Sequence, residues 1–349
     1  MIERYKKSVE LDPNDPDAWI NLGDAYYDEG NYDGAIESYK KAIDINPYFS
    51  EVWNNLGLSY SMKRESQIAI DCYKKALELE PDDAITYYNI GFAFEDLDDF
   101  DNALKQYKIA LEYEPSYTDV WNNIALIHRE REQFDKAIEC YNKAISINPD
   151  EPILLNNLAI IYYDMQDYDN AILYYKKALE LDEYNAELWF DMGDVAYEKN
   201  DYNLAKLCYK KATELDPLFI EAWNNLGLSF TFLNEYEKSV QSYSQAIKLG
   251  SEDIILYENI AFSYTALEDY DNAISYYQKA LELDPDSLST LKKIGNLYLE
   301  IKKDYEKALI YCKRILSLDP SDNDFNKSLH MCYSELEKQK DKITTEEKS

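Results

Sequence analysis

Apolar and small side chains recur along the chain in two stripes within every 34 residues. In each unit of this length, positions 4, 7, 8 and 11 are spaced i, i+3, i+4 and i+7, which places them on one face of a helix. Positions 20, 24 and 27 form a second stripe, and short polar turns such as EGNY and LNEY separate the two. The pattern therefore predicts tandem helix hairpins.

Prolines set the register of this repeat. Seven of the ten prolines lie on a 34-residue grid, in which Glu183 and Ser251 occupy the two vacant positions, and Pro320 follows after a one-residue insertion near Lys302. A period of this size is typical of a solenoid array. Each unit begins three residues after a grid position, so nine tandem units are predicted over 16–322, with starts at residues 16, 50, 84, 118, 152, 186, 220, 254 and 288.

Within the units, a few positions are nearly constant. Position 8 is always Gly or Ala, which lets two helices approach closely, and position 24 is tyrosine from Tyr39 to Tyr277. A proline ends the second helix. Residues with a side-chain oxygen fall where the second helix needs an N-cap. These are Asn31, Asp99, Asp167, Asp201 and Asp269.

The chain closely resembles the tetratricopeptide repeat (TPR) family over residues 1 to about 338. One unit carries the full set of characteristic residues, which are Trp19, Leu22, Gly23, Tyr26, Ala35, Tyr39, Ala42 and Pro47. The resemblance implies an all-α fold, a right-handed superhelical α-solenoid whose first helices line a concave groove.

The two ends depart from complete repeats. Residues 1–15 read as a partial repeat, a second helix without its first, so the start is expected to be truncated or to need covering. Residues 323–338 read as a C-terminal capping helix, and 339–349 as a solvated tail.

Composition narrows the classes of partner. The chain has 36 basic and 68 acidic residues, a formal charge of −32, which disfavours nucleic acid and favours either a basic partner or simple solubility. The five cysteines are scattered without a CxxC pair, as expected of buried thiols in a reducing compartment. No signal region or long apolar run is seen, so we expect no membrane partner and a cytoplasmic location.

Asparagine at position 6 faces away from the predicted core. A carboxamide can pair with both the N–H and the C=O of one peptide unit. The row resembles the asparagine ladder of O-linked N-acetylglucosamine transferases, which implies that it holds a peptide backbone; alternatively, it only links neighbouring helices. Its members are Asn21, Asn55, Asn89, Asn123, Asn157, Asn225 and Asn259.

Other residues predicted on the same groove are apolar or acidic. The apolar members at position 9 are Phe92, Leu126, Ile160 and Phe262. Two acidic patches lie 170 residues apart and indicate a duplicated five-repeat block. Each patch either holds a Lys or Arg of a ligand or is merely a solvated face. They comprise Asp17, Asp24 and Asp28 in the first block, and Glu187, Asp191, Asp194 and Glu198 in the second.

No catalytic, cofactor or metal motif stands out. The two histidines are 202 residues apart, and no glycine-rich phosphate loop is present. We expect a non-catalytic scaffold that binds extended peptide segments, either basic or mixed apolar and basic. Two alternatives stay open: the recognition arm of a larger enzyme such as a protein glycosyltransferase, and a self-associating structural array.

Overall fold

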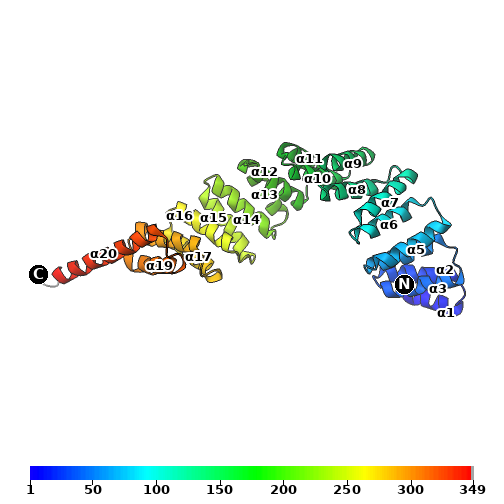
Figure 1. Ribbon diagram of the computed structural model, residues 1–349, viewed down its shortest axis with the longest axis horizontal. Coiled ribbons are helices and arrows are strands. Elements are labelled where there is room, and N and C mark those ends of the chain that lie inside the picture. The colour runs from blue at the N-terminus through cyan, green and yellow to red at the C-terminus, as the bar shows by residue number, and fades with distance from the viewer. Residues whose placement is uncertain (347–349) are drawn as a thin grey trace. The chain divides into compact units, whose positions relative to one another are not determined.

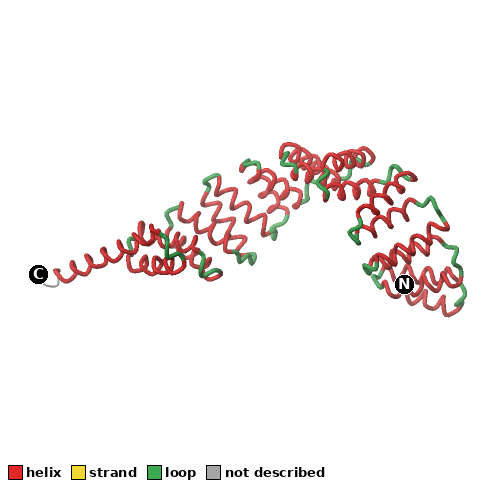
Figure 2. The backbone as a smooth tube through the Cα atoms, viewed as in Figure 1, coloured by secondary structure: helices red, strands yellow, loops and turns green. Residues whose placement is uncertain are grey.

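The computed structural model describes residues 1–346, and over these residues it contains only helices and short connections (Figure 2). The predicted all-α solenoid of tandem helix hairpins is confirmed. The chain forms two compact units, the first spanning Met1–Gln166 and the second beginning at Asp167. Each unit is described by itself.

In the first unit, helices that follow one another in the sequence pack side by side (Figure 1). Its helices are α1 (Ile2–Leu11), α2 (Pro16–Asp28), α3 (Tyr32–Ile45), α4 (Ser50–Met62), α5 (Ser66–Leu79), α6 (Ala84–Glu95), α7 (Phe100–Tyr113), α8 (Thr118–Glu130), α9 (Phe134–Ile147) and α10 (Pro152–Asp164).

The second unit repeats the arrangement and contains one π-helical segment, η1. Its helices are α11 (Tyr168–Leu181), α12 (Ala186–Glu198), α13 (Tyr202–Leu215), α14 (Ile220–Phe232), α15 (Tyr236–Lys248), α16 (Ile254–Ala266), α17 (Tyr270–Leu283), α18 (Leu288–Asn296), η1 (Leu297–Lys302), α19 (Tyr305–Leu318) and α20 (Asn323–Glu346).

The turn inside each hairpin has a recurrent backbone geometry. Position 15 adopts a left-handed conformation, with φ of 75° at Gly30 and 64° at Asn200. The next N–H then bonds back to position 11, as Asn31 does to the Tyr26 carbonyl at 2.8 Å. Such a bond satisfies a carbonyl at the end of the first helix. All five predicted N-caps accept a backbone N–H of the second helix.

The core of each hairpin is a tyrosine ring against a small residue. Tyr39 and Tyr209 at position 24 are 1% exposed. A Cβ placed on Gly23 would lie 2.5 Å from the Tyr39 ring, too close for any real contact. The close approach at Gly23 therefore requires glycine, whereas Ala125, Ala159 and Ala261 occupy position 8 in other units.

Tryptophan at position 4 adds a link that the sequence did not reveal. The Trp53 and Trp223 indoles each donate a hydrogen bond of 3.0 Å to the carbonyl of the proline six residues earlier. The bond ties the start of a first helix to the loop that precedes it. The apolar face of the ring is thereby held against the neighbouring helices.

Three features near the ends refine the predictions. Val9 of α1 is buried against Leu22, whereas Tyr5 on the same face of the helix is half-buried. The inserted residue near Lys302 is absorbed by η1, since π-helical turns are a common way to accommodate one extra residue. Helix α20 does not stop at residue 338 but continues to Glu346, and the rest of the predicted tail lies outside the described residues.

Candidate functional site

The candidate site lies on what we call the first-helix face, formed by positions 2, 6, 9 and 13 of the first helix in each repeat. Position 2 is exposed in both units, as at Asp17 and Glu187, whereas position 6 is mostly half-buried. Asn21 is exposed and Asn123 is buried, while the other five predicted asparagines are half-buried. The row is therefore less accessible than the sequence suggested.

Two of these asparagines are bonded to another asparagine of the preceding first helix. The Asn89 amide donates to the Asn54 side-chain oxygen, and the Asn157 amide donates to that of Asn122, each at 3.0 Å. The acceptor is position 5 of the repeat before, the first asparagine of the WNN sequence. This pairing was not predicted from the sequence, although the repeated Asn–Asn dipeptide was its signal.

The remaining bonded amides use other partners. Asn21 donates to the backbone oxygen of Asp17 at 2.6 Å, within its own helix. Asn123 donates to the Tyr107 hydroxyl at 3.1 Å. Much of the row thus links helices, which is the alternative that the sequence left open. Each amide still has a second N–H, because these bonds use only one.

A carboxylate, a tyrosine and an asparagine meet in the first acidic patch. One oxygen of the Asp24 carboxylate accepts two hydrogen bonds. The Tyr39 hydroxyl donates the first at 2.7 Å, and the Asn55 amide donates the second at 3.5 Å. The tyrosine comes from the second helix of the repeat and the asparagine from the next repeat. Asp24 is consequently tied into the core, whereas Asp17 and Asp28 of the same patch are exposed.

The second acidic patch contains the same arrangement. Asp194 accepts the Tyr209 hydroxyl at 2.6 Å and the Asn225 amide at 3.1 Å. Burial raises the pKa of the Asp194 carboxyl, and these two hydrogen bonds partly oppose that effect. Burial and the adjacent carboxylate also raise the pKa of Tyr209, which stays a hydrogen-bond donor at neutral pH.

The two patches differ in formal charge at one position. Asp191 takes the place that Asn21 holds 170 residues earlier. Burial, followed by the charges of Asp194 and Glu187, raises the pKa of Asp191 from 3.8 to about 6. Like charges crowded together disfavour ionisation, so this patch is the more strained of the two at neutral pH.

A small cavity of about 140 Å³ opens beside the first patch. Asp24, Asp28 and Asn55 supply its polar wall, and Tyr27, Tyr39 and Leu58 supply aromatic and apolar surface. No lysine or arginine is among these lining residues. The cavity can therefore accept a cationic group between two carboxylates and an aromatic ring.

The apolar residues predicted for the groove are accessible. Phe92 is 44% and Phe262 is 48% exposed, while Leu126 and Ile160 are half-buried. Phe92, Leu126 and Ile160 present apolar surface beside the asparagine row in the first unit, and Phe262 does so in the second.

The basic residues on or beside this face are already paired with acids. Arg129 bonds Asp164 at 2.6 Å, and Lys293 bonds Glu258 at 2.8 Å. Lys292 bonds Asp322 at 2.6 Å. The carboxylates of the two acidic patches are not neutralised by these three side chains.

One of the two histidines is held by a hydrogen bond close to its own helix. His128 bonds Gln133 at 3.0 Å, and burial lowers its pKa. Within the described part of the chain, no group of three or more His, Cys, Asp or Glu could hold a metal ion. Over residues 1–346, no helix combines the length and apolar character needed to cross a bilayer.

Family models match most of the chain. A model described as the C-terminal domain of cilia and flagella-associated protein 70 matches residues 105–315, which is more than half of the sequence. Models of the tetratricopeptide repeat match residues 23–63, 50–83, 5–37 and 72–105. No curated protein sequence matches the chain.

Solved structures of repeat proteins share the fold. The C-terminal part of a TPR repeat-containing protein from Cytophaga hutchinsonii has a TM-score of 0.54 at 19% identity, covering 78% of this chain and 98% of that one. A TPR protein from Parabacteroides merdae has a TM-score of 0.52 at 17% identity, covering 71% and 98%. MamA is 32% identical with a TM-score of 0.43, covering 46% and 95%.

Proposed function

The chain belongs to the tetratricopeptide repeat family, and we propose that it is a non-catalytic protein-interaction scaffold. In this proposal, the first-helix face binds an extended peptide segment that carries Lys or Arg together with apolar side chains. The observation that carries the proposal is the cavity beside Asp24 and Asp28, whose lining has two carboxylates and no cation.

The charge and shape of the cavity both suit a cationic side chain. A Lys or Arg head group entering this cavity would meet both carboxylates and the Tyr27 ring, which combines ionic and cation–π attraction. The Asp24 carboxylate needs little reorganisation, because the Tyr39 hydroxyl and the Asn55 amide already hold one of its oxygens. The exposed Phe92 and Ile85 would receive apolar side chains of the same segment.

The asparagine row has a secondary part in the proposal. Asn89 and Asn157 hold successive first helices together, and the second N–H group of Asn89 is left to donate to a peptide carbonyl. The backbone of the ligand would be bound without regard to its sequence, and the acidic patches would select for cationic side chains. The five free cysteines are buried thiols, which fits the cytoplasmic location that we also propose.

The test compares acidic residues of the two patches with acidic residues elsewhere. We expect Asp24→Asn with Asp28→Asn, and separately Asp194→Asn with Glu198→Gln, to weaken binding of an arginine- and leucine-containing peptide by about tenfold, since each pair removes two ionic contacts. Fluorescence anisotropy of the labelled peptide measures the change.

The matched control removes the same charge from a second helix. Glu37→Gln with Asp44→Asn alters two exposed acids of α3. Binding should stay within about twofold of the unmodified chain, because these residues lie off the first-helix face. An equal loss in control and patch variants would mean that net charge alone attracts the peptide, and the proposal would be wrong.

A further inference from the structure

Two adjoining cavities lie on the other side of α14, between the second helices α13 and α15. Their volumes are about 460 and 550 Å³, and they share Lys210, Glu214, Phe230 and Lys238. The larger one is also lined by Trp223 and Leu226, which are core positions of α14 rather than positions of the first-helix face. The size is that of an ordinary ligand pocket.

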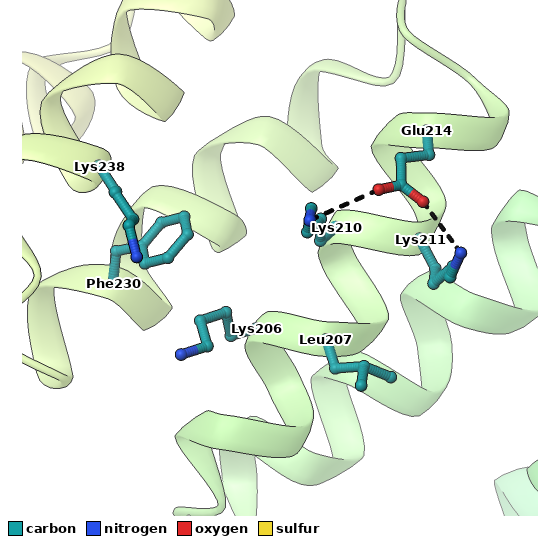
Figure 3. A pocket seen from close by; sticks show the side chains of 7 residues that line it. All are labelled: Lys206, Leu207, Lys210, Lys211, Glu214, Phe230 and Lys238. Atoms are coloured by element: carbon teal, nitrogen blue, oxygen red, sulfur yellow. Dashed lines mark hydrogen bonds and ion pairs between the residues drawn. The ribbon is translucent and has the colours of Figure 1, made fainter.

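Lysines surround this space in an otherwise acidic protein. Figure 3 shows Lys206 and Lys238 near the Phe230 ring, and Lys210 and Lys211 beside Glu214. The ammonium groups of Lys206 and Lys238 lie 5.8 and 5.5 Å from the centre of the Phe230 ring. The residues lining the two cavities include four lysines and one glutamate, a formal charge of +3.

The ion pairs around the cavity do not use all the N–H donors of its lysines. Glu214 bonds Lys211 at 3.0 Å and lies 3.7 Å from Lys210, while Glu235 bonds Lys206 at 2.8 Å and Lys238 at 2.5 Å. An ammonium group has three N–H donors, so each lysine can donate a hydrogen bond to a further carboxylate. Lys210 and Lys238 keep more than half of their side-chain surface exposed.

The first unit lacks this chemistry at the corresponding positions. Residues 170 earlier than Lys206 and Thr213 are Ile36 and Ile43, which belong to or pack against the core. Over all the positions matching the cavity lining, the first unit has three lysines and three acids, a formal charge of zero. The positive charge is therefore a property of the second unit.

We propose that this basic cavity binds an acidic peptide segment of another protein, inserting one apolar side chain between α13 and α15. The inserted side chain packs on Phe230 and Trp223, and the flanking carboxylates pair with Lys210, Lys211 and Lys238. The charge argues for this occupant, because a chain of net charge −32 repels acidic peptides everywhere except at such a patch. The proposal concerns a different face and an opposite ligand charge from the proposed function.

The test uses a fluorescein-labelled peptide of glutamates around a single phenylalanine, with anisotropy as the readout. Lys210→Glu with Lys211→Glu should weaken binding by at least about tenfold, since attraction becomes repulsion. The matched control is Lys40→Glu with Lys41→Glu, the same two positions in the first unit, and it should leave binding unchanged.

A second variant fills the cavity instead of reversing its charge. Lys206→Ile with Thr213→Ile installs the two residues that the first unit carries, so the fold should tolerate them. We expect loss of binding with an unchanged circular dichroism spectrum. A peptide of glutamate alone should bind at least about tenfold more weakly than the phenylalanine peptide, because it has no side chain to insert.

Three results would overturn the proposal. The first is equal binding by the Lys210→Glu/Lys211→Glu and Lys40→Glu/Lys41→Glu variants, and the second is equal binding of the two peptides. The third is a concentration-dependent dimer in light scattering that disappears in the Lys210→Glu/Lys211→Glu variant and that the peptide does not displace. In that case, the occupant is a second copy of the chain.

Discussion

The first two repeats of each five-repeat block, 16–83 and 186–253, agree on one face and differ on the other. On the first-helix face, Asp24 with Tyr39 and Asn55 is matched bond for bond by Asp194 with Tyr209 and Asn225. On the second-helix face, isoleucines of the first block are replaced by lysine and threonine.

This difference reflects how tightly each face is connected to the core. The acidic residue at position 9 accepts a hydrogen bond from a tyrosine that is 1% exposed, so changing it would leave a buried hydroxyl unpaired. The second-helix positions that differ carry no such hydrogen bond in the first block, where Ile36 and Ile43 pack in or against the core through apolar contact. The two faces can therefore differ in charge while the hairpins stay the same.

The strongest test removes the shared tyrosine from each block. Tyr39→Ala and Tyr209→Ala should each lower the free energy of unfolding by about 3–5 kcal/mol, because a large buried ring is lost and a cavity is left. Urea denaturation measures the loss. If the two blocks share one core design, the two losses should agree.

Exposed tyrosines provide the control for this test. Tyr48 and Tyr184 are 78% and 76% exposed, so Tyr48→Ala and Tyr184→Ala should change the free energy of unfolding by less than about 0.5 kcal/mol. A loss for Tyr39→Ala or Tyr209→Ala no larger than for these controls would contradict the burial described above.

A smaller effect is expected where the blocks differ at position 6. The pKa of Asp191 is about 6 in the folded chain and its ordinary value is 3.8, so the folded state binds more protons between these values. Stability therefore falls as the pH rises through this window. Asp191→Asn should raise the free energy of unfolding by about 1–2 kcal/mol at neutral pH, after allowance for partial exposure.

The pH dependence separates this cause from others. The gain should shrink as the pH falls from about 7.5 towards about 4.5, where the folded carboxylate becomes neutral. The reciprocal change, Asn21→Asp, introduces into the first block the residue that the second block carries, and should destabilise it at neutral pH. Urea denaturation at several pH values measures both; a gain independent of pH would contradict the assignment to Asp191.

The smallest effect concerns ion pairs that are present at a position in one block and absent from the matching position in the other. Lys63 bonds Asp33 at 2.7 Å, and Lys199 bonds Asp169, yet the residues at their matching positions are Leu233 and Glu29. The acids are more than four-fifths exposed. Lys63→Met and Lys199→Met should lower the Tm by no more than about 2 °C, because exposed ion pairs contribute little.

Thermal unfolding at low and high salt gives the control for the ion pairs. The small difference should vanish at high salt, where exposed charges are screened. A drop in Tm that persists at high salt would mean that the lysine stems, rather than their charges, support the packing.

The sequence by itself determined the hairpins, because helix periodicity, caps and close packing are local. Asn31 and Asp99 cap second helices where they were predicted, and Gly23 meets the Tyr39 ring as the small-residue position required. It also located both acidic patches on one helix face. The extent of α20 was missed, since a polar, charged segment offers no apolar stripe that marks its end.

Only the tertiary structure decided what the polar side chains bond to. Asn89 reaches Asn54 across 35 residues, and Tyr39 reaches Asp24 from another helix, so neither pairing follows from periodicity. The basic cavity depends on which side chains surround the Phe230 ring. The net charge of the sequence does not reveal it, because that charge is summed over the whole chain. Local patterns specify helices, whereas hydrogen-bond partners and cavities depend on how those helices pack.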